Sequence, residues 1–335
     1  MSHGPHHHRP VGPRVDATHI AAALSEPGGR YTVTTHRKPD GDAAGSMIGL
    51  ARVLRGRGHD VVMWHVEGPE LPDELAWLLE PGEDVQGGQV ADAADRVLVS
   101  VDAATSHRVT DEDPTSLGRP IINIDHHHDD PAWGDLNLID GEASSTAELV
   151  LRVMDAMGAP LDRRIALPLY VGLVTDTGRF SYSSTGAGAH AAAARMIEAG
   201  VDPGAVYRRL YEGIPLGDLR LAGRAVAGAR SELDGRLVVA VITPADERAA
   251  GGTDSDGVVE ALRGARGAQV AAVIRQVADG EWRVSTRASG GEIDVSAIAA
   301  REGGGGHRAA AGFTSHRPPD EIIALIRQAM LDQGA

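Results

Sequence analysis

The sequence contains no cysteine and few aromatic residues, and these shortages exclude several kinds of chemistry. Without cysteine, the 335-residue chain can form no disulfide, no thiolate nucleophile and no cysteine-ligated zinc site. A metal site would have to use His and carboxylate groups, which favour Mn²⁺, Mg²⁺ or Fe²⁺ over Zn²⁺. Aromatic residues make up only 3% of the chain, which argues against long base-stacking platforms for nucleic acid.

Positive charge is also scarce, because 32 Lys and Arg residues oppose 47 Asp and Glu residues, for a net charge of -15. Proteins that coat long nucleic acid bind through Lys and Arg, so we expect no such partner. A small phosphate ester held through divalent cations stays compatible with this charge. No apolar run reaches the ~18 residues of a membrane span, so no membrane partner is expected. Residues 1–17, rich in His, Pro and Gly, lack a signal-peptide core and predict a disordered tail on a cytoplasmic protein.

The first half of the chain alternates short β-branched runs with helical stretches, which is typical of a parallel sheet. Ser145 and Glu148 form the capping-box pattern of a helix start. The apolar run 167–174 fits a helix or a strand, and we interpret it as a helix. The predicted strands are 31–35, 61–66, 97–101 and 121–124, and the other predicted helices are 43–55 and 146–157.

The second half begins with Ala-rich and helical stretches that predict a connector, and a smaller α/β unit follows from about Leu237. Its predicted strands are 237–242, 270–276 and 282–286, and its predicted helices are 258–262, 294–301 and 320–331. We therefore predict an α/β protein of two domains with a cleft between them. The predicted segments are a tail over 1–17, a parallel-sheet domain over 18–187, a helical connector over 188–222 and a smaller α/β domain over 223–335.

Acidic and His side chains recur where three of the predicted strands, 31–35, 97–101 and 121–124, end. Each group alone has an ordinary explanation: residues 39–42 favour a turn, Asp102 could cap a helix, and residues 126–130 could form a solvated loop. Ligands of open α/β sheets bind outside the carboxyl ends of the strands, so the three groups would converge on one crevice. Carboxylates crowded there would repel one another unless cations compensated them. Two cations about 3.5–4 Å apart activate water and clamp phosphate oxygens, so the pattern predicts phosphoryl hydrolysis.

The same residues carry a family resemblance. Residues 35–43 resemble the first motif of the DHH phosphoesterase superfamily, residues 101–103 its second motif, and residues 125–127, Asp-His-His, the signature that names it. Residues 172–180 resemble its fourth motif, and residues 303–307 resemble the glycine motif of the DHH-associated domain. The motifs occur in the family's order and extend over nearly the whole chain. They look most similar to nanoRNases that also act on 3'-phosphoadenosine 5'-phosphate (pAp), whose relatives include cyclic dinucleotide phosphodiesterases.

The resemblance implies two Mn²⁺ ions per active site, with Mg²⁺ or another divalent ion as an alternative. The implied ligands are His36, Asp40 and Asp102 for one ion, and Asp42, Asp102, His126 and Asp176 for the other. Asp102 would therefore bridge the ions, and His127 would contact the scissile phosphate or its leaving oxygen. These two are the predicted catalytic residues, whereas His128 receives no role.

The four consecutive glycines at 303–306 would suggest a flexible linker on composition alone. They lie inside a predicted folded unit, however, and Gly-rich turns let backbone N–H groups approach an anion closely. The pattern and the resemblance both indicate a clamp for a phosphate that is not cleaved. The predicted substrate-binding residues are Ser285, Arg287, Gly304, Gly305, Gly306, His307 and Arg108.

The sequence therefore predicts a two-metal hydrolase of small nucleotide phosphoesters. Short oligoribonucleotides, pAp, and linear or cyclic dinucleotides such as cyclic di-AMP are the candidate substrates, and the sequence does not rank them. An inorganic pyrophosphatase and a RecJ-like exonuclease are the alternatives among enzymes. A nucleotide-binding sensor is the alternative outside them, although a sensor would be expected to lack metal ligands and none is missing. The oligomeric state is left open, with a homodimer as one expectation because such relatives often dimerise.

Overall fold

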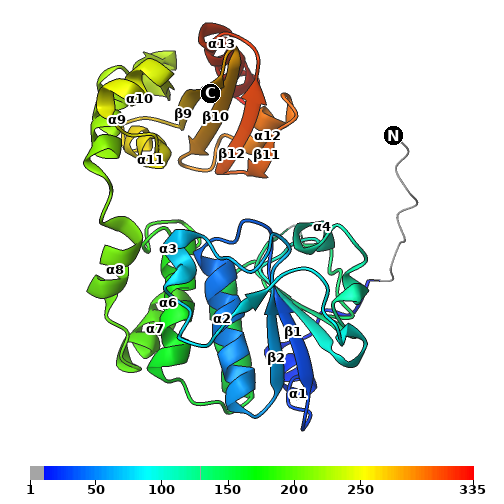
Figure 1. The fold of residues 1–335 in the computed structure, drawn as a ribbon. Coiled ribbons are helices and arrows are strands. Elements are labelled where there is room, and N and C mark those ends of the chain that lie inside the picture. Colours follow the sequence, from blue (N-terminus) through cyan, green and yellow to red (C-terminus); the bar gives the residue numbers. More distant parts are fainter. Residues whose placement is uncertain (1–10, 129) are drawn as a thin grey trace. The chain divides into compact units, whose positions relative to one another are not determined.

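The computed structural model describes residues 11–128 and 130–335, and the chain divides into two compact units, Met1–Glu212 and Gly213–Ala335. Each unit contains one six-stranded sheet (Figure 1). Residues 1–10, most of the predicted tail, lie outside the described residues. From Gly12 the chain departs from the predicted disorder, because Gly12 N donates to Gly134 O and Val15 N donates to Asn137 O.

The sheet of the first unit is parallel throughout, as predicted, with strand order β3-β2-β1-β4-β5-β6. Its strands are β1 Arg30–Thr34, β2 Asp60–Trp64, β3 Val85–Gln86, β4 Val97–Val101, β5 Ile121–Asp125 and β6 Leu136–Ile139. Strand β5 is buried at every position, which is the pattern of a strand covered on both faces. The strands β3 and β6 were not predicted, and both are short edge strands.

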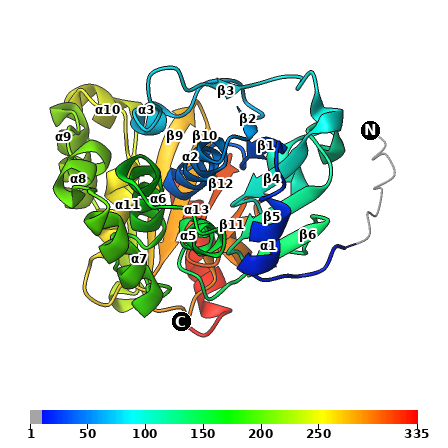
Figure 2. The same cartoon turned by 90° about the horizontal axis from the view of Figure 1, so that it is seen from below.

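Helices α2, α5 and α6 pack against one another beside this sheet (Figure 2). The predicted helix at 167–174 is confirmed as part of α6, which contains Pro168. Gly45 of α2 permits the close approach of α6, because a Cβ there would lie 2.2 Å from the carbonyl oxygen of Pro168. The helices of the first unit are α1 Ala17–Ala23, α2 Gly41–Gly56, α3 Asp73–Ala76, α4 Ser106–Val109, α5 Thr146–Ala156, α6 Arg163–Asp176, α7 Ala187–Glu198 and α8 Pro203–Tyr211.

The predicted connector, 188–222, is divided between the two units. Helices α7 and α8 belong to the first unit, where Ala189 and Met196 of α7 are buried in the core shared with α5 and α6. The next helix, α9 Leu216–Ala227, belongs to the second unit, where Leu221 is buried. The apolar faces of these helices therefore serve two separate cores.

The sheet of the second unit is mixed, with strand order β11-β12-β10-β9-β8-β7 and one parallel pair, β8 with β9. Helices α9, α10 and α11 lie together at one side of this unit (Figure 1) and contribute to one buried cluster, whereas α12 and α13 contribute to another. Its strands are β7 Arg230–Glu232, β8 Leu237–Ile242, β9 Val270–Ala278, β10 Glu281–Ala288, β11 Gly305–His307 and β12 Ala310–Ser315. Its remaining helices are α10 Pro244–Ala250, α11 Asp256–Arg263, α12 Val295–Ala300 and α13 Pro319–Leu331.

Candidate metal centre and substrate pocket

The segment after β1 brings three of the predicted ligands together. His36 is buried in the loop that follows the strand. Asp40 is the N-cap of α2, and its Oδ1 accepts hydrogen bonds from the backbone N–H groups of Asp42 and Ala43 at 3.1 and 3.0 Å. Asp42 is buried in the first helical turn. Residues 39–42 therefore form a helix start, in which a capping carboxylate and a buried carboxylate lie two residues apart.

Asp102 lies in the middle of the cluster, directly after β4. Its backbone adopts φ 57°, a left-handed conformation that Asp tolerates better than most residues. Its Oδ2 lies 3.5 Å from His36 Nε2, and its Oδ1 lies 3.6 Å from His126 Nε2. Thr146 at the start of α5 donates its hydroxyl to Asp102 Oδ1 at 3.0 Å. Asp102 thus contacts residues from both groups of predicted ligands, as a bridging ligand would.

The ends of β5 and α6 complete the cluster. His126 Nε2 lies 3.3 Å from Asp176 Oδ2, although these residues are fifty positions apart in the sequence. Three overlapping sets of ligand atoms result, each lying within 4.8 Å of one another. The sets are His36, Asp40 and Asp102; Asp42, His126 and Asp176; and Asp102, His126 and His127. The structure therefore brings all six predicted metal ligands together.

The electrostatics of this cluster fit divalent cations. Burial, together with the charge of Asp102, raises the pKa of Asp176 to about 8. The same causes raise the pKa of Asp42 well above its ordinary value. Carboxyl groups that hold protons near neutral pH in a metal-free site would release them to solvent when cations bind, because metal ligands must be deprotonated. The donor set of carboxylates and imidazoles, without thiolate, suits Mn²⁺ or Mg²⁺.

His127 is oriented by a buried carboxylate to which the sequence analysis assigned no role. Asp125 Oδ1 lies 2.7 Å from His127 Nδ1 and also accepts the backbone N–H of His126 at 2.8 Å. Burial alone would lower the pKa of His127, but the Asp125 carboxylate raises it to about 9. A second buried acid, Asp130, lies beside Asp125, and burial and this neighbour raise the pKa of Asp130 to about 7. The sequence does not show that Asp130 is buried beside Asp125, because this burial arises only in the folded chain.

Arg108, His128 and a cavity beside Asp40 surround this cluster in the sequence or in the fold. Arg108 on α4 is half-buried and close enough to His36 and His127 for its charge to act on both. His128 is exposed. A cavity of about 490 Å³ is lined by Asp40, Lys38 and their neighbours, so it adjoins the metal cluster. Arg108 therefore adds positive charge near the metal cluster, and its contact with phosphate stays a prediction.

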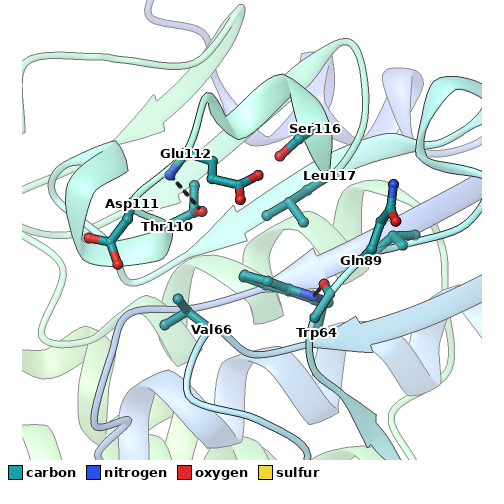
Figure 3. Close-up of a pocket in the computed structure, with 10 residues that line it drawn as sticks. Trp64, Val66, Gln89, Thr110, Asp111, Glu112, Ser116 and Leu117 are labelled. Atoms are coloured by element: carbon teal, nitrogen blue, oxygen red, sulfur yellow. Dashed lines mark hydrogen bonds between the residues drawn. The ribbon is translucent and has the colours of Figure 1, made fainter. Parts of the chain in front are cut away.

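A different pocket of the first unit, of about 530 Å³, is formed after β2 and around the residues that follow α4 (Figure 3). Trp64, Val66 and Leu117 give it apolar walls, and Asp111 and Glu112 add carboxylates. The predicted metal ligands are not among the residues that line it. Its acidic character makes it a poor site for a phosphate group.

The predicted substrate residues of the second unit lie together. Ser285, Arg287 and the glycines 304–306 line a cavity of about 870 Å³, which Arg283 and Glu260 also line. The glycine run is not a loose linker, since Gly305 and Gly306 pair with Gly312 and Ala311 of β12. His307 pairs through its backbone in the same ladder, and its side chain lies outside what the structure describes.

Arg287 is not bare in this cavity. Its Nε donates to Glu260 Oε1 at 3.2 Å, and its Nη1 donates to the carbonyl oxygen of Thr286 at 3.1 Å. Neither contact was predicted from the sequence. Both partners hold the guanidinium at one end of β10, where its remaining N–H groups can bind an anion.

Comparisons with known proteins agree with this geometry. Residues 30–173 match the DHH family, N-terminal domain, and residues 224–332 match the DHHA1 domain. The bifunctional oligoribonuclease and PAP phosphatase NrnA of Thermus thermophilus is 33% identical over 88% of this chain and 87% of its own. The chain therefore belongs to the DHH family, a family of divalent-metal-dependent phosphoesterases, as its motifs predicted.

One further relative and one solved structure are similar to this chain. The cyclic-di-AMP phosphodiesterase PdeA of Listeria monocytogenes is 27% identical over 88% of this chain, which spans only 46% of that relative. The crystal structure of an exopolyphosphatase-related protein from Bacteroides fragilis superposes with a TM-score of 0.83 at 24% identity, covering 94% of this chain and 96% of that one. The second similarity confirms the predicted α/β fold class. Among residues 11–128 and 130–335, no helix has the length and apolar character needed to cross a membrane.

Proposed function

We propose that this protein is a Mn²⁺-dependent hydrolase of short oligoribonucleotides and pAp. The observation that carries the proposal is the convergence of six carboxylate and imidazole ligands around Asp102. The Thermus thermophilus relative, named as an oligoribonuclease and PAP phosphatase, supports this substrate class over pyrophosphate. The presence of a DHHA1 domain with an Arg-containing cavity supports a substrate that has a second phosphate.

The predicted ligand sets are assigned accordingly. One ion would be held by His36, Asp40 and Asp102, and the other by Asp42, Asp102, His126 and Asp176. When bound, the two ions supply Lewis acidity that activates water and neutralises the phosphate charge. The Asp42 carboxylate accepts hydrogen bonds from the backbone N–H groups of Thr146 and Ala147 at 2.6 and 2.9 Å. The N-terminus of α5 therefore orients this carboxylate.

His127 is assigned to the leaving oxygen, which it stabilises or protonates. Its Nδ1 lies within hydrogen-bonding distance of Asp125, which orients the ring and favours the charged imidazolium that such a role requires. Arg108 is assigned as a further contact to the phosphate. It is a positive charge near the cluster, close enough to act on His36 and His127. In the second unit, Arg287, Ser285 and the backbone of residues 304–306 bind a phosphate that is not cleaved.

A substrate panel tests the proposal. The full-length protein with Mn²⁺ is assayed on pAp, on oligoribonucleotides of two to five residues, on linear and cyclic di-AMP, and on pyrophosphate, and the substrates are compared by kcat/KM. We expect pAp and the short oligoribonucleotides to have the highest values. Pyrophosphate as the preferred substrate would replace the proposal by a pyrophosphatase, and tight nucleotide binding without turnover would replace it by a sensor.

A further inference from the structure

The face of β10 that lines the cavity carries a second arginine, Arg283, in addition to the predicted Arg287. Val284 and Thr286 are buried on one side of this strand. Side chains alternate along a strand, so Arg283, Ser285 and Arg287 share the opposite side. All three line the cavity of about 870 Å³. Ser285 and Arg287 were predicted from the sequence as substrate-binding residues, but Arg283 was not.

The arginines of this face differ in whether an acid neutralises them. Arg287 pairs with Glu260 at 3.2 Å. Arg275 of β9 pairs with Glu247 at 2.7 Å. Arg283 is exposed and has no ion pair with any residue that the structure describes. Arg283 is therefore an uncompensated charge of this cavity.

The acids that line the cavity are also engaged elsewhere. Glu260 contacts Arg263 at 2.8 Å in addition to Arg287. Glu302 contacts Arg317 at 3.5 Å. Neither acid is left to neutralise Arg283. An incoming anion would be the counter-charge that Arg283 lacks.

The neighbour of Arg283 on the next strand offers it no counter-charge. Arg283 lies directly opposite Arg275 in the antiparallel pairing of β10 with β9. Arg275 is itself a cation, and its acid partner Glu247 is engaged with it at 2.7 Å. An anion bound at Arg283 would form charge-assisted hydrogen bonds with the guanidinium.

Arg283 lies at a different position along β10 from Arg287, the arginine of the predicted phosphate clamp. Arg283 and Arg287 are four residues apart on an extended strand, so their Cα atoms are about 13 Å apart. The head of Arg287 is held at its own end by Glu260 and Thr286. A phosphate bound at Arg287 would therefore leave Arg283 available to bind a second phosphate. Gly312, opposite Ser285 on β12, adds no side chain between the two positions.

We propose that Arg283 forms a second phosphate subsite, which binds a non-scissile phosphate other than the one at Arg287. This rests on the proposed function. The separation of the arginines favours two phosphates that are set apart by a nucleoside, as in oligoribonucleotides of three or more residues. A 5'-diphosphate end offers the same chemistry with adjacent phosphates, and the experiment distinguishes the two sources. The subsite makes the enzyme prefer oligoribonucleotides to pAp.

The test uses the full-length protein with Mn²⁺ and three substitutions: Arg283→Ala, Arg283→Lys and the matched control Arg266→Ala. Arg266 is an exposed arginine of the second unit that does not line the cavity. The substrates are pAp, which has one non-scissile phosphate, pentaadenylate with a 5'-phosphate, and diadenylate with a 5'-diphosphate. Melting temperatures establish that each variant is folded.

We expect Arg283→Ala to lower kcat/KM for the pentanucleotide about tenfold more than for pAp, mainly through KM, which corresponds to ~1.4 kcal/mol. The slope of log KM against log salt concentration for the pentanucleotide should fall by roughly 0.7, the value for one phosphate contact on a single strand. Arg283→Lys should restore part of the loss, because it keeps the charge without the bidentate fork. Arg266→Ala should match the wild type on all substrates.

Three outcomes would overturn the subsite. An equal loss on pAp and the pentanucleotide would mean that Arg283 binds the same phosphate as Arg287. No loss on any substrate would mean that Arg283 is an ordinary surface residue. A loss confined to the 5'-diphosphate substrate would reassign the subsite to adjacent phosphates. If the wild type hydrolysed none of the substrates, the proposed function would fail, and binding of fluorescent pentaadenylate to wild type and Arg283→Ala would still test the subsite.

Discussion

Asp125 Oδ1 lies 2.7 Å from His127 Nδ1, and the Asp125 side chain is completely buried. The carboxylate therefore fixes the ring of the residue assigned to the leaving oxygen and favours its charged form. The adjacent acid Asp130 accepts the side-chain amide of Asn123 at 2.7 Å and the backbone N–H of Ala132 at 2.7 Å. A chain of buried polar groups thus extends from β5 to His127.

This relationship predicts the effect of Asp125→Asn. An amide cannot stabilise the imidazolium as a carboxylate does, so the pKa of His127 should fall from about 9. We expect kcat to drop roughly 10–100-fold, the usual loss when a residue that orients an active-site His is changed. The alkaline limb of the kcat–pH profile should move to lower pH. An unchanged profile would contradict the role of Asp125.

The raised pKa values predict how the metal-free protein responds to pH. The folded protein keeps the proton of Asp176 up to about pH 8, whereas an unfolded Asp loses it near pH 4. Between these values the unfolded state binds fewer protons, so the free energy of unfolding falls as pH rises. His127, whose pKa is raised to about 9, acts in the same direction above pH 6.5. The melting temperature in EDTA should therefore be higher at pH 5.5 than at pH 8.

Mn²⁺ and Asp176→Asn are the controls for that measurement. Cations bind the folded protein and favour deprotonated ligands, so Mn²⁺ should raise the melting temperature more at pH 8 than at pH 5.5. Asp176→Asn removes one of the titrating acids and should reduce the pH dependence in EDTA. A melting temperature that rises with pH in EDTA would show that these carboxyl groups are not crowded as the structure has them.

Asp102→Asn should nearly abolish turnover while preserving the fold. Asp102 has φ 57°, and Asn tolerates this left-handed conformation, so no new backbone strain is introduced. The substitution removes the charge of the residue that contacts His36, His126 and His127. Circular dichroism checks the fold, and kcat on pAp checks the activity. A variant with a tenth or more of the wild-type activity would disprove the assigned bridge.

Removal of the metal should inactivate the enzyme. Carboxylate and imidazole ligands without thiolate favour Mn²⁺ over softer ions, so EDTA should abolish activity, and Mn²⁺ should restore it better than Mg²⁺ or Ca²⁺. Activity is measured after dialysis and addition of each ion, with metal content determined in parallel. Full activity in a sample shown to be metal-free would exclude a two-metal hydrolase.

Arg287→Ala should separate two kinds of substrate. Charge-assisted bonds to a non-scissile phosphate contribute remote binding energy, so kcat/KM for pAp should fall by roughly 10²-fold, at about 1.4 kcal/mol per tenfold change. Bis(p-nitrophenyl) phosphate has no second phosphate, and its hydrolysis should barely change. His307→Ala is tested in parallel on both substrates. A parallel loss on both substrates would mean that the cavity of the second unit is not a phosphate clamp.

The sequence by itself determined much of the first unit and indicated the candidate ligands. Strand β4 was predicted with its observed bounds, and α6 was predicted as a helix, because apolar period and helix-start patterns are local properties of the chain. The short edge strands β3 and β6 carry too few residues for such a pattern. The motif residues could be assigned to one crevice because parallel strands place their carboxyl ends at the same edge.

Only the tertiary structure decided which of these groups contact one another. His126 meets Asp176 only in the folded chain, where the end of β5 and the end of α6 come together. Helix α6 also packs closely on α2 at Gly45, although these two segments are over one hundred residues apart in the sequence. Packing also decides the difference between Arg287, which Glu260 of another element neutralises, and Arg283, which no described acid neutralises. Charge pairing depends on distances in the folded chain, and no local pattern in the sequence records those distances.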